Sequence, residues 1–287
     1  MSLSFNFGFK ESLSRTFYLL GANKIKILFF MFVSAMLQAQ IYSLEFKAKV
    51  TGDAEDIAQA VASGAVFLSA EMLIGLIIFS VVAGGMLKGV LGRKPIFATS
   101  KVMFGSLSSL IVALSIATVI LGGMFQMLHG NLDEMDAAKK QEAAVGFLAV
   151  ALPLIMGIPY AISAKVMSQL TLNRSIKASN PGLRNKAIRS ISGYQNGFVA
   201  FFVAWKKVFT EPYFLLYAIT FVLFVSPELY LPNNIKESLL PVFLGVIGHT
   251  MVILMYLTAF DDGLVRYLNA DAVESKEDFP VVGANDY

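Results

Sequence analysis

The sequence contains no cysteine, only two histidines and few charged residues for its length. Without cysteine there are no disulfide bonds, thiolate nucleophiles or cysteine-bound metals. With only His129 and His249 we expect no histidine-rich metal or haem site and no cofactor. Charged residues make up 15% of the 287 residues and hydrophobic residues 56%. Soluble domains average about 25% charged residues, so this composition predicts an integral membrane protein.

Six long apolar stretches divide the chain, and each has the length that a helix needs to cross a hydrocarbon core of about 30 Å. A spanning segment must satisfy its backbone hydrogen bonds internally, which a helix does. We therefore expect an all-α transmembrane bundle over residues 1–267, followed by an acidic cytoplasmic tail over 268–287. The predicted spans cover about 25–44, 65–87, 102–127, 145–167, 214–231 and 239–260.

Lysine and arginine are distributed unevenly among the predicted loops. Eighteen of the 23 fall in the two termini and in the second and fourth loops. Lys and Arg are retained on the cytoplasmic side during insertion, so both termini are expected in the cytoplasm, in a bacterial inner membrane.

The basic fourth loop, over 165–207, is a candidate contact for anionic lipid headgroups. We expect no nucleic-acid partner, because topology alone predicts this charge. The tail acids, counted from Asp261 and Asp262, are read as a solvating tail or a contact for a basic partner.

Two amphipathic segments are predicted to lie in the inner membrane interface, at about 5–22 and 186–210. In the second, Trp205 stands beside Lys206 and Lys207, a pairing typical of a membrane–water boundary. A buried re-entrant segment is the alternative for 186–210. Each amphipathic segment directly precedes a span, so the chain can be read as two three-helix halves of opposite topology, as in many transporters. Independent origin of the two amphipathic helices explains the pattern as well.

The layout of these segments resembles a known family. An amphipathic N-terminal helix leads into the first span, glycine-rich second and third spans follow, and "GIPYAISAKVMSQLTL" leads into "FVAWKKVFTEPY" before the last two spans. This order is similar to that of the YciC-type family of small six-helix bacterial inner-membrane proteins. The resemblance covers most of the chain and implies a fold, a topology and a membrane, but no chemistry.

Two side chains inside predicted spans are candidates for an intramembrane polar site. Glu71 is predicted near the outer boundary of the second span, where it could couple transport to protons or cations or simply form a buried hydrogen bond. His249 lies near the middle of the sixth span, where it could relay protons or bond a neighbouring helix. They could meet only if the second and sixth spans are neighbours, which the sequence does not determine.

Glycines point to helix packing rather than to chemistry. Gly85 and Gly89 are four residues apart in the second span, a spacing that suits close contact with another helix, and the third span is its expected partner. Their spacing does not match a phosphate-binding loop.

No catalytic arrangement of residues is present in the sequence. The favoured hypothesis is a non-enzymatic membrane protein: a structural or accessory subunit of an envelope assembly, or a membrane-homeostasis factor, with lipids and a protein partner or a second copy as its contacts. The alternative is a small-solute or ion transporter built from inverted halves, with Glu71 as its coupling group.

Overall fold

The computed structural model describes residues 9–92, 94–132, 158–159, 161–176, 202, 205–206, 219–220, 222–224, 231 and 238–274. Every regular element within these ranges is a helix, and four of them are long and apolar enough to cross a membrane. The predicted all-helical fold is confirmed within these ranges, and the four apolar helices agree with the membrane protein predicted from composition. The principal helices are α1 (Phe9–Ala22), α2 (Lys24–Thr51), α3 (Ala54–Leu91), α4 (Pro95–Leu132) and α10 (Leu240–Glu274).

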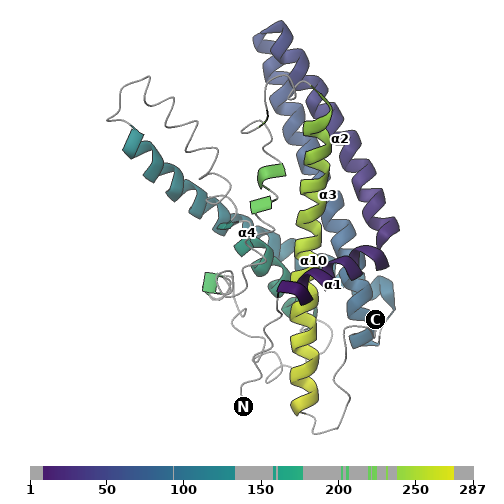
Figure 1. Ribbon diagram of the computed structural model, residues 1–287. Coiled ribbons are helices and arrows are strands. Elements are labelled where there is room, and N and C mark those ends of the chain that lie inside the picture. Colours follow the sequence, from purple (N-terminus) through teal and green to yellow (C-terminus); the bar gives the residue numbers. More distant parts are fainter. Residues whose placement is uncertain are drawn as a thin grey trace.

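α2 and α3 form a long antiparallel hairpin (Figure 1). Gly52 ends α2 in the left-handed conformation with φ of 63°, and its N–H donates to the carbonyl of Ala48. Asp53 then caps α3 by accepting a hydrogen bond from the N–H of Glu55. Residues 45–64, which lie between the first two predicted spans, are therefore helical almost to the turn, because no helix-breaking residue precedes Gly52.

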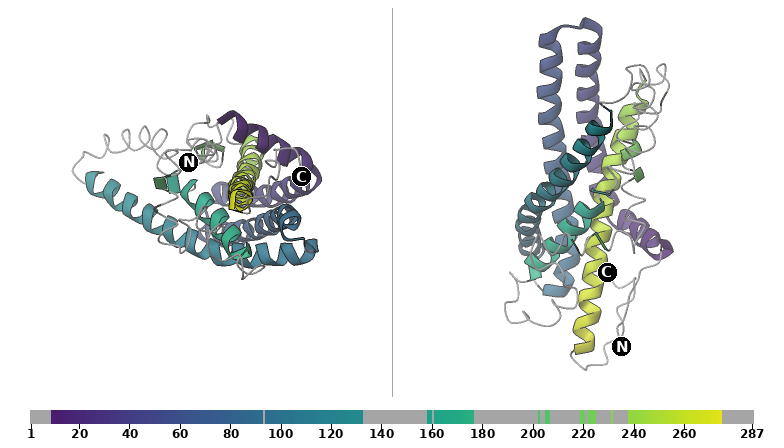
Figure 2. Two further views of the ribbon diagram at one scale, coloured as in Figure 1. Left: turned by 90° about the horizontal axis from the view of Figure 1, so that it is seen from below. Right: turned by 90° about the vertical axis from the view of Figure 1, so that its left-hand side faces the viewer.

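α3 and α4 are the tightly packed pair that the sequence predicts, but their closest approach is at Gly84 and not at Gly85 or Gly89. A Cβ built on Gly84 would lie 2.6 Å from the Cα of Thr99, whereas one built on Gly85 would meet nothing within 4 Å. Gly89 is exposed. The expected packing role of Gly85 and Gly89 is not observed, since that face of α3 points away from α4. Toward its C-terminal end α4 diverges from the hairpin (Figures 1 and 2).

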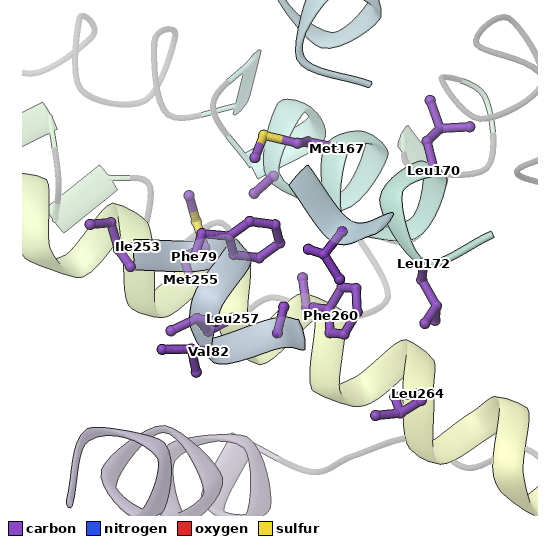
Figure 3. Close-up of a cluster of buried hydrophobic side chains, with 14 of the residues drawn as sticks. Phe79, Val82, Met167, Leu170, Leu172, Ile253, Met255, Leu257, Phe260 and Leu264 are labelled. Carbon is purple, nitrogen blue, oxygen red and sulfur yellow. The ribbon is translucent and has the colours of Figure 1, made fainter. Parts of the chain in front are cut away.

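α10 runs along the hairpin and contacts both α2 and α3. The core lies between α10, α3 and a buried helix over 161–176, where Phe79 meets Phe260 edge to face with ring centroids 5.8 Å apart. Figure 3 shows these two rings among the aliphatic side chains of the three helices. The second and sixth predicted spans are thus neighbours, the condition for Glu71 and His249 to meet.

Residues 168–176, expected in the basic fourth loop, are helical and largely buried. Packing explains the difference: Ser168 and Gln169 donate hydrogen bonds to carbonyl oxygens of α10, and Ser175 donates to that of Lys101 in α4. The predicted span at 145–167 is described only from residue 158 onward. The span at 214–231 and the amphipathic segment at 186–210 lie mostly outside the described residues, so six spans stay a prediction.

α1 falls within the predicted amphipathic segment at 5–22 and crosses α10 rather than running beside it (Figures 1 and 2). Its residues Thr16 and Leu19 are buried, while Phe17 is 63% exposed. Trp205 and Lys206 are helical and exposed, and Lys207 lies outside the described residues. α10 continues to Glu274, so the first part of the predicted tail at 268–287 is helical.

Candidate intramembrane polar site

Glu71 lies near the middle of α3, far from the turn that joins α2 and α3. Because α3 begins at Ala54, Glu71 is 17 residues into the helix, about 25 Å from its start. Its contact partners Ser34 and His249 stand at the midpoints of the predicted spans 25–44 and 239–260. The carboxyl group is therefore level with the centres of these two predicted spans, and its position relative to the outer boundary of the membrane stays a prediction.

Four polar side chains from three helices converge there. Ser34 of α2 donates its hydroxyl hydrogen to Oε1 of Glu71. Gln38, one turn further along α2, places its amide Nε2 2.7 Å from Oε2 of Glu71 and 3.3 Å from Nδ1 of His249. Nδ1 of His249 lies 3.2 Å from Oε1 of Glu71. The Glu71 side chain is 3% exposed and that of His249 19%, so the imidazole is the more accessible end of the group.

Two glycines bring the three helices close enough for these contacts. A Cβ built on Gly75, one turn after Glu71, would lie 3.4 Å from Cδ1 of Ile253 in α10 and 3.6 Å from Cε2 of Phe30 in α2. A Cβ on Gly245, one turn before His249, would lie 3.5 Å from Oε1 of Gln38. Small residues let helix backbones approach each other in a membrane, and here they flank the polar site on two of its helices.

Sequence reasoning found Glu71 and His249 but missed the roles of Ser34 and Gln38. Gln38 and Gln40 both lie toward the end of the first predicted span, and the sequence does not distinguish them. The structure separates the two: Gln38 is half-buried against Glu71, whereas Gln40 is exposed. One signal was available, because Ser34 and Gln38 are four residues apart and so share one face of a helix.

A second polar region lies further along α10, where two adjacent acids form ion pairs with basic side chains of two other helices. Asp261 is paired with Arg15 of α1, and Asp262 with Lys165 at 3.2 Å. Thr16 and Thr258 add a hydrogen bond of 2.9 Å between their hydroxyl oxygens. Asp261 and Asp262 are buried, so reading them as the start of a solvating tail is wrong. Lys165 is equally buried and is not part of a lipid-facing basic loop.

The remaining chemistry is limited. Within the described part of the chain, no group of three or more His, Cys, Asp or Glu residues is placed to hold a metal ion. The Glu71 group offers one carboxylate and one imidazole, too few protein ligands for a structural metal site. A scan against protein-family models and searches among curated proteins and solved structures each found no match to this chain.

Proposed function

We propose that this chain is a multi-pass transporter of a bacterial inner membrane that moves a small cation (H⁺, Na⁺ or K⁺) through the Glu71–His249 site. One observation carries the proposal: a carboxyl, an imidazole and an amide from three helices meet at the mid-depth of the predicted spans. Ionisable groups at that depth are costly and usually belong to ion or proton pathways. Four side chains form the contact, which suits an ion better than a larger solute.

The position of the site relative to the predicted halves supports transport over an accessory role. Ser34, Gln38 and Glu71 belong to the first and second predicted spans, and His249 belongs to the sixth. The contact therefore joins the two halves. Transporters with inverted repeats hold their sites near the midplane at such an interface. A purely structural subunit needs no titratable pair there.

We also propose six spans with both termini in the cytoplasm, in the layout of YciC-type proteins. The crossing of α1 over α10 and the exposure of Phe17 support an interfacial position for α1. The cysteine-free chain allows single-cysteine labelling in intact cells. We expect Lys49→Cys to react with an impermeant reagent from outside and Lys94→Cys to stay protected. Both positions are exposed, so a reversed result would refute this topology.

Transport can be measured with the purified chain in liposomes that contain a pH-sensitive dye. We expect protein-dependent proton movement after a pH step, or after external Na⁺ or K⁺ is added. Glu71→Gln should abolish it, because the amide cannot exchange a proton. Glu55→Gln, an exposed acid at the start of the same helix, is the matched control and should behave as the unmodified chain. Absence of protein-dependent flux under all three gradients would refute transport. Co-purification with a larger assembly would then favour the accessory role.

A further inference from the structure

We infer that the Glu71–His249 pair is a binding site for a single exchangeable proton and not for a metal cation. The inference identifies the coupling ion of the proposed function and so rests on the same site. It begins with the two facing atoms, Oε1 of Glu71 and Nδ1 of His249, which lie 3.2 Å apart. Both are acceptors when neither carries a hydrogen. A hydrogen between them converts this contact into a hydrogen bond, so the pair has a place for one proton.

Gln38 allows that proton to leave while Glu71 and His249 both keep a hydrogen-bond donor. Its amide nitrogen carries two N–H groups and lies within reach of both Oε2 of Glu71 and Nδ1 of His249. When the pair is deprotonated, one N–H donates to the carboxylate and the other to the bare Nδ1. When a proton from water arrives, an O–H bond forms on Oε1 and the new hydroxyl donates to Nδ1 in place of the amide. In both states Oε1 of Glu71 and Nδ1 of His249 each keep a hydrogen-bond partner.

The surroundings favour a proton over a metal cation. Glu71 is contacted by donor groups, the hydroxyl of Ser34 and the amide N–H of Gln38. A hard cation needs about six oxygen ligands, and these contacts direct hydrogens, not oxygens, at the carboxylate. The charged residues on the helices packed against the site are distant. The nearest along each helix are Glu45 of α2, about 10 Å from Gln38, Asp56 of α3, about 22 Å from Glu71, and Asp261 of α10, about 18 Å from His249.

Infrared difference spectroscopy of the full chain in lipid bilayers tests the inference without any gradient. Between high and low pH we expect a carbonyl band of a protonated carboxylic acid that shifts in heavy water. The band should be absent in Glu71→Gln, perturbed in His249→Gln and unchanged in His129→Gln, the matched histidine control. Loss of the band on adding Na⁺ or Ca²⁺ at constant pH would mean that the site binds a metal cation, and would overturn the inference.

Nitrogen NMR of the histidines gives a second reading that does not depend on whether Glu71→Gln folds. In His129→Gln only His249 remains, and at high pH we expect its neutral form to carry hydrogen on Nε2, with Nδ1 bare to accept from Gln38. A hydrogen on Nδ1 at high pH would contradict the role of Gln38. A Glu71 band without proton flux would leave the proton site standing and refute transport. Flux in Glu71→Gln, or flux without the band, would refute the proton site.

Discussion

Two polar regions lie along α10, about 18 Å apart, and they accommodate polar atoms in different ways. In the first region Glu71 contacts Ser34, Gln38 and His249, none of which carries a permanent positive charge. At Asp261 and Asp262 each acid meets a basic side chain from another helix. Fixed ion pairs hold helices in place, whereas a carboxyl beside an imidazole can gain or lose a proton. The first region has the properties of a proton-binding site, and the second has those of a structural contact between helices.

The largest effect is expected where a buried charge loses its partner. Lys165→Met leaves Asp262 without its cation and should destabilise the folded chain by about 3–5 kcal/mol. The double variant Lys165→Met with Asp262→Leu should recover most of that loss, because no charge remains buried. Denaturant unfolding in detergent micelles measures both.

The matched control for this pair is the exposed ion pair of Lys47 and Asp56, 2.7 Å apart at the tip of the hairpin. Lys47→Met should change stability little, because water screens both groups. Equal losses of stability in Lys165→Met and Lys47→Met would mean that the buried pair stabilises the helix packing no more than an exposed pair does.

The Arg15–Asp261 pair should contribute less to stability than the Lys165–Asp262 pair, because the Arg15 side chain is 12% exposed. Arg15→Met should cost about 2 kcal/mol, the scale of a hydrogen bond to a charged group. It should also loosen α1, since α1 is held on α10 by this pair and by the contact of Thr16 with Thr258. Hydrogen exchange of α1 amides reports the loosening directly. Thr16→Val, which keeps the ion pair, should show the smaller increase in exchange.

The sequence predicted the two regions unequally, and packing explains why. Apolar runs reveal which polar residues are enclosed, so Glu71 and His249 stood out as candidates. They do not reveal how helices are aligned with one another. That alignment depends on the turn at Gly52 and Asp53, and it places Glu71 level with Ser34. The helix ends could not be read from hydropathy, because polar residues continue the helices at both ends of the apolar runs.

The acids at Asp261 and Asp262 were misread for a related reason. A charged pair directly after an apolar run has the pattern of a helix leaving the membrane, and nothing nearby in the sequence identifies its partners. Arg15 is 246 residues from Asp261, and Lys165 is 97 residues from Asp262. Only the folded arrangement of α1, α10 and the 161–176 helix brings them together. Long-range ion pairs of this kind have no local signature, whereas a lone acid in an apolar run does.

Separating the helices at the first region should remove its chemistry at a moderate cost in stability. In Gly75→Val the added methyl groups would meet Ile253 and Phe30, which already stand 3.4 and 3.6 Å from a built Cβ. We expect a loss of about 1–3 kcal/mol from overpacking and a changed histidine NMR signal as α10 moves away from Glu71. Gly85→Val is the control, because a Cβ there meets nothing within 4 Å. An unchanged His249 signal in Gly75→Val would show that α10 does not depend on this close approach.

The smallest effect on stability is expected from the substitution that should matter most for activity. Glu71→Gln keeps the size of the side chain, and its amide oxygen can still accept a hydrogen bond from Gln38 or Ser34, so unfolding should be nearly unchanged. Glu71→Ala should cost about 1 kcal/mol, the scale of an interhelical hydrogen bond in a membrane. The same acid-to-amide change at Asp262 should be strongly destabilising, because Lys165 would keep a buried charge without its partner. Equal destabilisation by Glu71→Gln and Asp262→Asn would mean that Glu71 is also a fixed charge in the architecture, and the contrast between the two regions of α10 would be lost.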